Sequence, residues 1–235
     1  MIPNADDPSW LARNIDEVRE RVYLAAREAG RSDDEITIVA VSKTHPRSMV
    51  DEAHELGLDV FGENRVQEAV AKFAEPMPTE MRVHLIGQLQ TNKAKAAIGL
   101  FDRIESVDRL SLIAALEKEA AKAETLVSVL LQVNIGREPQ KSGCLPEEAL
   151  ALVDAIRESD HLRLDGMMGI APMVADAEEA RPYFRLLREV RDEVSRGSPD
   201  VDLPVLSMGM SGDFESAILE GATHVRIGSA IFGER

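Results

Sequence analysis

The sequence has few of the features that mark secreted, membrane-bound or nucleic-acid-binding proteins. Its one cysteine, Cys144, excludes an internal disulfide framework and is typical of a reducing cytoplasm. No apolar run reaches the roughly 20 residues of a membrane span, and the first residues, MIPNADDPSW, lack the charged and apolar regions of a signal peptide. Lys and Arg number 27 against 42 Asp and Glu, and this net charge of −15, without a basic cluster, argues against a nucleic-acid or membrane partner. We therefore expect a cytoplasmic protein.

Short apolar runs alternate with segments of helical periodicity along the whole chain. Hydrophobic residues make up 44% of the 235, which is enough for one large core. Strands are expected within residues 36–41, 58–61, 82–86, 101–106, 125–136, 162–170, 204–208 and 223–228. Helices are expected at 10–29, 46–57, 65–74, 91–97, 108–123, 146–159, 176–195 and 214–220.

This alternation predicts an α/β fold, a (β/α)8 TIM-type barrel. Alternating strands and helices form parallel βαβ units, and eight strands are the number that closes this barrel. We expect a single domain over residues 1–235, in which the extra N-terminal helix at 10–29 covers surface that a short C-terminus leaves bare. The rival fold is an open doubly wound sheet, which is disfavoured because no G-x-G-x-x-G turn follows the first strand.

Residues just after the strands of such a barrel gather at one face, where barrel proteins place their sites. Lys43 follows the buried first strand, ITIVAV. The loops SMGMSGD and RIGSAIFG follow the seventh and eighth strands, and barrels often bind phosphate there. We expect Ser211 to cap the helix after the seventh strand. Asp213 and Glu215 should point outward, because carboxylates would repel a phosphate.

A lysine facing a phosphate site suggests that one ligand spans the mouth of the barrel. Pyridoxal 5′-phosphate (PLP) fits, because its aldehyde forms a Schiff base with a lysine amine and its phosphate needs a separate anchor. The same lysine could instead be an aldolase nucleophile that acts on a phosphorylated sugar. Composition and spacing leave both readings open.

The segments AVSKTHP, FGENRVQE, HLIGQLQTNK, KSG, LSMGMSGDFESAI and VRIGSAIFGE, in this order, resemble the pyridoxal phosphate homeostasis proteins. These are single-domain barrels similar to the N-terminal domain of alanine racemases, and the match runs from about Ile36 to the end. The resemblance implies a set of cofactor-binding residues: Lys43 as the Schiff-base lysine, Asn64 near the ring, Ser207 in the same pocket, Arg226 at the pyridine nitrogen, and Ser211, Gly228 and Ser229 at the phosphate. Arg65 stands where some members carry tyrosine, and we expect it to be peripheral.

The arginine implied at the ring favours binding over catalysis. Arginine offers only donors, so it keeps a pyridine nitrogen unprotonated and the ring a poor electron sink. Racemases of this type add a tyrosine base from a second domain, whereas Tyr23 and Tyr183 lie in predicted helices away from the strand ends. The resemblance therefore implies a monomeric PLP carrier or buffer in intracellular PLP homeostasis, with little or no catalysis, whose partners include PLP-requiring apo-enzymes.

Two other functions compete with this one. A PLP-dependent amino-acid racemase or Schiff-base lyase acting on a small substrate is the alternative. An interaction scaffold without a ligand leaves Lys43, Arg226 and the two Gly/Ser loops unexplained.

Several further residues carry separate expectations. The histidines show no metal-ligand spacing, so no metal site is expected. His84 points either into the barrel or onto the helices, and His45 is expected at a helix entry. Lys141 lies near the predicted mouth, where we expect it to assist cofactor entry or exit. Cys144 is expected to be a neutral loop cysteine.

Overall fold

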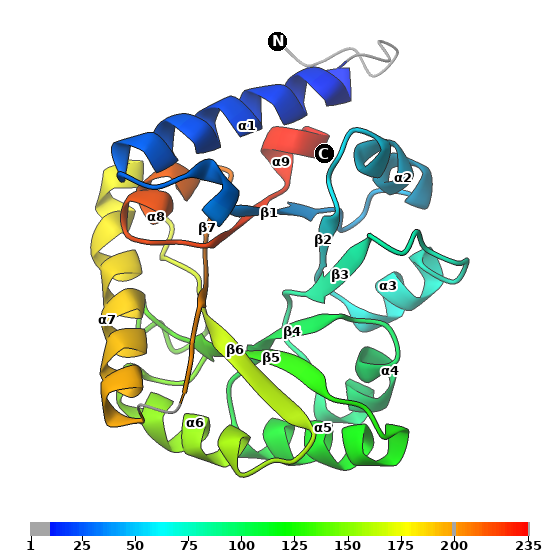
Figure 1. The fold of residues 1–235 in the computed structure, drawn as a ribbon, viewed down its shortest axis with the longest axis vertical. Coiled ribbons are helices and arrows are strands. Elements are labelled where there is room, and N and C mark those ends of the chain that lie inside the picture. Colours follow the sequence, from blue (N-terminus) through cyan, green and yellow to red (C-terminus); the bar gives the residue numbers. More distant parts are fainter. Residues whose placement is uncertain (1–9, 199–200, 235) are drawn as a thin grey trace.

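Eight parallel strands close into a barrel in the computed structural model, which describes residues 10–198 and 201–234 (Figure 1). The strands are β1 Thr37–Val41, β2 Val60–Glu63, β3 Arg82–Leu85, β4 Arg103–Val107, β5 Val127–Val133, β6 Leu162–Gly169, β7 Val205–Met210 and β8 His224–Ile227. β1 pairs with β8, with Val39 opposite Arg226, and this pairing closes the sheet. The barrel prediction is confirmed, and the open doubly wound sheet is excluded. The first nine residues, which the signal-peptide argument used, lie outside the described range.

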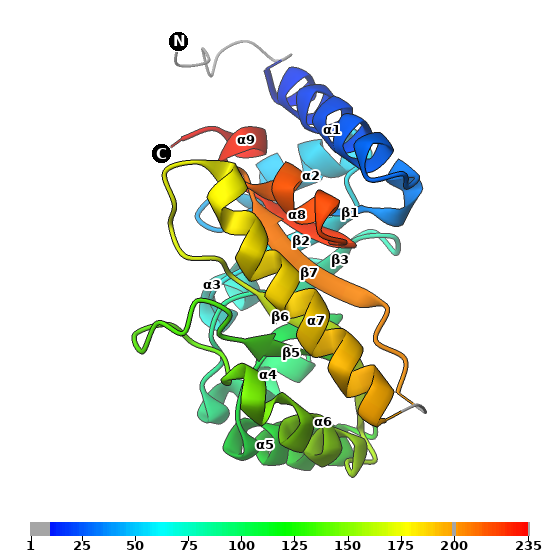
Figure 2. The same cartoon turned by 90° about the vertical axis from the view of Figure 1, so that its left-hand side faces the viewer.

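Helices cover the outside of the barrel and connect its strands (Figures 1 and 2). The α-helices are α1 Trp10–Glu28, α2 Arg47–Glu55, α3 Val66–Lys72, α4 Ala94–Ile98, α5 Leu110–Ala123, α6 Ala149–Arg157, α7 Arg181–Gly197, α8 Phe214–Leu219 and α9 Ser229–Phe232. Single 3₁₀ turns precede β1, α4, α6 and α7, at Asp33–Glu35, Thr91–Lys93, Pro146–Glu148 and Ala177–Ala180. Among the described helices, none is long and apolar enough to cross a membrane.

The N-terminal helix α1 takes the place that a full eighth helix would occupy. It packs against α8 and the short α9 (Figure 2). Its buried residues Leu11, Ile15, Val18 and Val22 recur at three- and four-residue intervals, as an amphipathic helix requires. Asn14 Nδ2 also donates a 2.9 Å hydrogen bond to the Ile231 carbonyl. The expectation that this helix covers otherwise bare surface is therefore confirmed.

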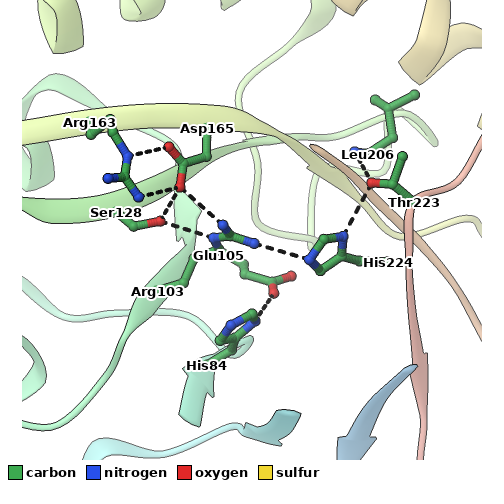
Figure 3. A network of polar contacts seen from close by, with 9 residues as sticks. All are labelled: His84, Arg103, Glu105, Ser128, Arg163, Asp165, Leu206, Thr223 and His224. Atoms are coloured by element: carbon green, nitrogen blue, oxygen red, sulfur yellow. Dashed lines mark hydrogen bonds and ion pairs between the residues drawn. The ribbon is translucent and has the colours of Figure 1, made fainter. Parts of the chain in front are cut away.

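The apolar core lies mainly between the strands and the helices, whereas much of the barrel interior is polar. A small separate apolar cluster of Leu130, Met168 and Val205, with Ile170 against it, occupies part of the interior. The rest includes a network of charged and hydroxyl side chains, seen in Figure 3. Barrels of this type usually fill the interior with branched apolar residues, so the polar interior calls for a functional explanation.

Strand β7 continues two residues beyond its predicted end at 208, because Gly209 lets it pass close to α8. Gly209 has φ +90°, and a Cβ there would lie 2.6 Å from the Ala217 Cβ. Only glycine combines a positive φ with so close an approach. The extension sets where the following loop begins, and therefore where Ser211 lies.

Candidate functional site

A cavity of about 870 Å³ opens at the carboxyl ends of the strands, where the fold predicted a site. Six of the seven sequence-predicted residues line it: Lys43, Asn64, Ser211, Arg226, Gly228 and Ser229. The seventh, Ser207, is fully buried and contacts Arg226 from below rather than lining the cavity. Lys141 adds a third cationic side chain to the lining, against one carboxylate, that of Glu234, among the described lining residues. In a chain of net charge −15, this cavity favours an anionic ligand.

The backbone that carries Lys43 is held on both sides. Before it, the Ser42 amide donates to the Gly62 carbonyl at 3.1 Å, and the Ser42 carbonyl accepts from Lys72 Nζ at 2.6 Å. After it, Thr44 has φ +69°, a left-handed conformation that is rare for a β-branched residue. Such strain, about 1–3 kcal/mol, persists only where the surroundings enforce it. The turn therefore holds the lysine at a defined place on the cavity wall.

A buried ion pair behind β1 provides part of this anchoring. Glu63 is fully buried at the end of β2, and its Oε1 lies 2.5 Å from Lys72 Nζ of α3. The same oxygen accepts a 2.8 Å hydrogen bond from Ser42 Oγ. Because both partners hold Ser42, the pair fixes the residue directly before Lys43.

Ser211 connects the loops after β7 and β8 on one side of the cavity. Its Oγ accepts hydrogen bonds from the amides of Gly228 and Ala230, at 3.2 and 3.3 Å. The expectation that Ser211 caps the next helix is wrong, because α8 begins at Phe214 with Asp213 at its N-cap position, and the Ser211 hydroxyl faces the loop after β8 instead. A hydroxyl and backbone amides are thereby brought together at the wall, and these are groups suited to a phosphate.

The two acidic residues after Ser211 take different positions. Glu215 pairs with Arg21 of α1 at 2.6 Å, away from the cavity, as expected. The expectation for Asp213 is wrong, because its carboxylate turns inward and accepts the Met210 amide at 2.6 Å. Burial raises the pKa of Asp213 above its usual range. The hydrogen bond from the Met210 amide therefore holds the Asp213 carboxylate within its own loop.

Arg226 lines the cavity from β8 and is 4% exposed. Its Nη2 donates to the Gly169 carbonyl at 2.9 Å, and its Nη1 donates to Ser207 Oγ at 2.8 Å. Burial lowers the pKa of Arg226, and the nearby carboxylate of Glu105 opposes this shift. Two hydrogen bonds leave the other N–H groups of the guanidinium available for a ligand.

Glu105 and His84 form a buried pair beneath Arg226, so His84 points into the barrel. His84 Nδ1 lies 2.8 Å from Glu105 Oε1, and Ser207 Oγ donates to Glu105 Oε2 at 2.5 Å. Burial alone would raise the pKa of Glu105, but the hydrogen bond and charge of His84, the charge of Arg226 and the Ser207 hydroxyl together lower it to about 2. Glu105 is therefore an ionised carboxylate at neutral pH.

A second polar cluster lies beside the Glu105–His84 pair in the barrel interior, and Figure 3 shows the two together; the His84 and His224 rings stack with centroids 6.3 Å apart. Asp165 accepts hydrogen bonds from Arg103 at 3.0 Å, from Ser128 at 2.5 Å and from Arg163 at 2.6 Å. Arg103 Nη1 also lies 3.1 Å from His224 Nε2. Burial lowers the pKa of His224 to about 4, and the charge of Arg103 adds to this against the opposing charge of Glu105. His224 is therefore neutral in the folded protein at neutral pH.

We expect the free energy of unfolding to fall as the pH is lowered from 6.5 towards 4. In that window the unfolded chain protonates His224, whose usual value is 6.5, whereas the folded protein, at about 4, does not. Between pH 7 and 5 this difference costs about 2 kcal/mol, and His224→Gln should remove that part of the decrease. Urea unfolding at the two pH values measures it. An unaltered decrease in His224→Gln would contradict the assignment.

Of the remaining candidates, Asn64 and His45 line the cavity and Arg65 does not. Asn64 lies at its wall and is packed tightly by Gly87, where a Cβ would meet the Asn64 carbonyl at 2.2 Å. Arg65 is exposed and pairs with Glu68, so it is peripheral as expected. His45 lines the cavity and stacks on Phe232 with ring centroids 5.0 Å apart, a contact that the expected helix-entry role omits.

Other residues lie away from the cavity lining. Tyr23 belongs to α1 and Tyr183 to α7. Cys144 is buried, and burial, with the charges of Glu148 and Asp108, raises the pKa of its thiol to about 12. It is therefore a neutral thiol at neutral pH, as expected. No group of three or more potential metal ligands occurs in the part of the chain that the structure describes.

Sequence reasoning missed Glu105 and the Glu63–Lys72 pair as parts of the site. A signal for Glu105 was present, because a carboxylate in the middle of a buried strand, RIESV, must have a buried partner. Its partners come from β3, β7 and β8, however, and their identity follows only from closure of the barrel. The Lys72 contact likewise depends on how α3 packs behind β1 and β2.

The sequence is similar to a known protein family and to several named proteins. Residues 11–235 match the family described as alanine racemase, N-terminal domain. The chain is 43% identical over 221 residues to the pyridoxal phosphate homeostasis protein of Aquifex aeolicus, covering 94% of this chain and 96% of that protein. It is 42% identical over 227 residues to the protein of the same name from Pseudomonas aeruginosa, covering 97% and 96%.

Several solved structures have the same fold as this chain. PipY of Synechococcus elongatus, determined with PLP bound, superposes with a TM-score of 0.80 at 36% identity, covering 92% of this chain and all (100%) of that one. An unknown protein from Bifidobacterium adolescentis gives a TM-score of 0.89 at 33% identity, with 98% of each chain covered. An alanine racemase of Clostridium difficile, at 14% identity and a TM-score of 0.69, shares the fold over 56% of its own length.

Proposed function

The chain belongs to the pyridoxal phosphate homeostasis protein family, and we propose that it binds PLP in this cavity and acts in PLP homeostasis as a carrier or buffer of the cofactor. The observation that supports this most directly is the placement of Lys43, Arg226 and the Ser211 loop around one cavity. Each is suited to a different part of one ligand. The sequence alone could not exclude an aldolase acting on a phosphorylated sugar, whereas family membership favours PLP.

The lining residues fit the chemical groups of PLP. When bound, PLP supplies an aldehyde that condenses with a lysine amine, a ring that can withdraw electrons, and a phosphate dianion. Lys43 is the only lysine that the structure places on the turn after β1 at the cavity wall, and it provides the amine. Ser211 and Ser229 provide hydroxyl donors for the phosphate, and Gly228, whose amide donates to Ser211 Oγ, lines the same part of the cavity. Asn64 borders the space for the ring, and the cavity volume of about 870 Å³ lies in the range of small-ligand sites.

Arg226 limits what the site can do with the ring. Its guanidinium stays protonated and can only donate, so a ring nitrogen that it contacts must accept and remain unprotonated. Arg226 therefore binds and orients the ring without making it a strong electron sink. This favours holding the cofactor over turnover of an amino acid.

The carrier and the racemase alternative differ in the side chains that they need at the cavity. A carrier needs only Lys43 to retain PLP, whereas a racemase of this type also needs a tyrosine base. Tyr23 and Tyr183 lie on α1 and α7, so neither can exchange a proton at a ligand in the cavity. If the protein were a racemase or a Schiff-base lyase, His45, which borders the cavity, would be the residue to exchange a proton with the ligand. We further propose that the loaded protein is a monomer that supplies PLP to apo-enzymes.

The test is uptake of PLP by the purified protein. After incubation with PLP and removal of the free cofactor, one equivalent should remain, with the visible absorbance of a lysine-bound aldehyde. Borohydride reduction should then add the mass of one reduced PLP to a peptide that contains Lys43. A colourless protein that retains no PLP would contradict the proposal. Assays of racemisation and lyase activity on common amino acids decide between carrier and enzyme, and turnover at ordinary enzymatic rates would favour the alternative.

We expect Lys141→Ala to change the rates of PLP loading and release. Lys141 lies on the loop after β5 at the cavity, with its Nζ 2.5 Å from Glu138 and 3.4 Å from the Ala171 carbonyl. Its charge is therefore at the cavity edge, where an entering anion passes. Stopped-flow absorbance measures both rates, with a shift of about threefold or more expected from the loss of one charge. Rates equal to those of the wild type would remove this role.

A further inference from the structure

A chain of hydrogen-bonded polar side chains leads from Arg226 into the barrel interior through Ser207, Glu105 and His84. Arg226 Nη1 donates to Ser207 Oγ, and the Ser207 hydroxyl donates in turn to Glu105 Oε2, at 2.8 and 2.5 Å. Glu105 is fully buried on β4, and its other oxygen is held by His84 of β3. Four strands thus contribute one residue each to a continuous chain that ends at the cavity.

The direction of each hydrogen bond in this chain is fixed by proton count. A serine hydroxyl has one proton, and an ionised carboxylate can only accept. Because the Ser207 hydroxyl donates its one hydrogen bond to Glu105, the Ser207 oxygen can only accept a hydrogen bond from Arg226. Without Glu105, the hydroxyl could rotate and leave Nη1 of a buried guanidinium without an acceptor.

Glu105 also balances the charge of Arg226 inside the barrel. Two buried charges connected through one hydroxyl stabilise each other far more than exposed charges do. The Gly169 carbonyl fixes the other end of the guanidinium, at 2.9 Å from Nη2. Arg226 is therefore held at two points, and the point formed by Ser207 depends on Glu105.

We propose that Glu105 is a positioning residue for cofactor binding, which acts through Ser207 to hold Arg226 against the ring nitrogen of PLP. This inference rests on the proposed function. It assigns a ligand-directed role to a carboxylate that does not line the cavity. Glu105 affects the ligand only through the contact between Arg226 and the ring nitrogen. Its loss should therefore lower the affinity only for ligands that have that nitrogen.

The test compares two ligands, PLP and 1-deazapyridoxal 5′-phosphate, in which a C–H replaces the ring nitrogen. Glu105→Gln should raise the dissociation constant for PLP about tenfold, as expected for loss of a charge-assisted hydrogen bond, and leave that for the analogue within about twofold of the wild type. Asp165→Asn is the matched control, because Asp165 is a largely buried carboxylate in the same barrel whose partners are Arg103, Arg163 and Ser128 rather than Ser207 and Arg226. It should leave both constants unchanged.

A double-mutant cycle tests the route through Ser207. Ser207→Ala should raise the PLP dissociation constant about tenfold, and adding Glu105→Gln should raise it little further, because the two changes break one path. If Glu105→Gln does not fold, as judged by circular dichroism, Ser207→Ala with the two ligands carries the test.

Distinct results would overturn the role. Unchanged PLP affinity in Glu105→Gln or Ser207→Ala, equal losses for PLP and the analogue, or multiplicative losses in the double variant would each refute it while leaving PLP binding by the wild type intact. Failure of the wild type to bind PLP would instead refute the proposed function on which the role depends.

Discussion

Lys43→Ala is expected to abolish covalent capture of PLP while leaving the barrel folded. The lysine supplies the amine, and no side-chain atom of alanine can replace it. After incubation with PLP and borohydride, the wild type should gain the mass of one reduced PLP and the variant should gain none. Non-covalent binding through Arg226 and the Ser211 loop should persist at lower affinity, since those groups are unchanged.

The fold should tolerate this change because Lys43 is half-buried at the cavity wall and the Ser42 contacts that anchor its turn are made by other side chains. We expect the unfolding free energy to change by less than about 1 kcal/mol. Lys118→Ala, on the exposed face of α5, is the control and should capture PLP like the wild type. Full mass gain in Lys43→Ala would show that another amine is the site.

Lys72→Met should produce the largest loss of stability. Lys72 is the cationic partner of Glu63, and the two side chains are 9% and 0% exposed. Removing one member of a buried pair leaves an uncompensated charge and costs about 3–5 kcal/mol. Denaturant unfolding at pH 7 measures this loss. PLP capture at Lys43 should also slow, because the Ser42 carbonyl loses its donor.

A surface pair on α5 is the matched control for this prediction. Lys122 Nζ lies 2.5 Å from Glu119, the same separation as in the buried pair, but the Lys122 side chain is 58% exposed. Lys122→Met should therefore cost no more than about 1 kcal/mol. Adding Glu63→Gln to Lys72→Met should restore part of the lost stability, since a neutral amide is less costly to bury than a carboxylate. Equal losses for Lys72→Met and Lys122→Met would mean that burial does not govern the pair.

Much of the fold and part of the site could be predicted because they depend on local pattern. Each barrel strand is a short apolar run between helical segments, so its position follows from neighbouring residues. Lys43, Arg226 and the two Gly/Ser loops were placed at one face because parallel strands bring their carboxyl ends together. Ser211 was assigned correctly to the cavity but wrongly to a helix cap, because its hydroxyl contacts amides of the loop after β8, which only the closed barrel brings beside it.

The sequence by itself determined the strand and helix order, the acidic surface and the motifs that identify the family. These properties are carried by residues close together in the chain. The tertiary structure alone decided which charges meet: Glu63 with Lys72, and Glu105 with His84 and, through Ser207, Arg226. A buried charge is tolerable only beside a partner, and that partner comes from another strand or helix. Closing β8 onto β1 is what places Arg226 beside the strand that leads to Lys43, and so completes the site.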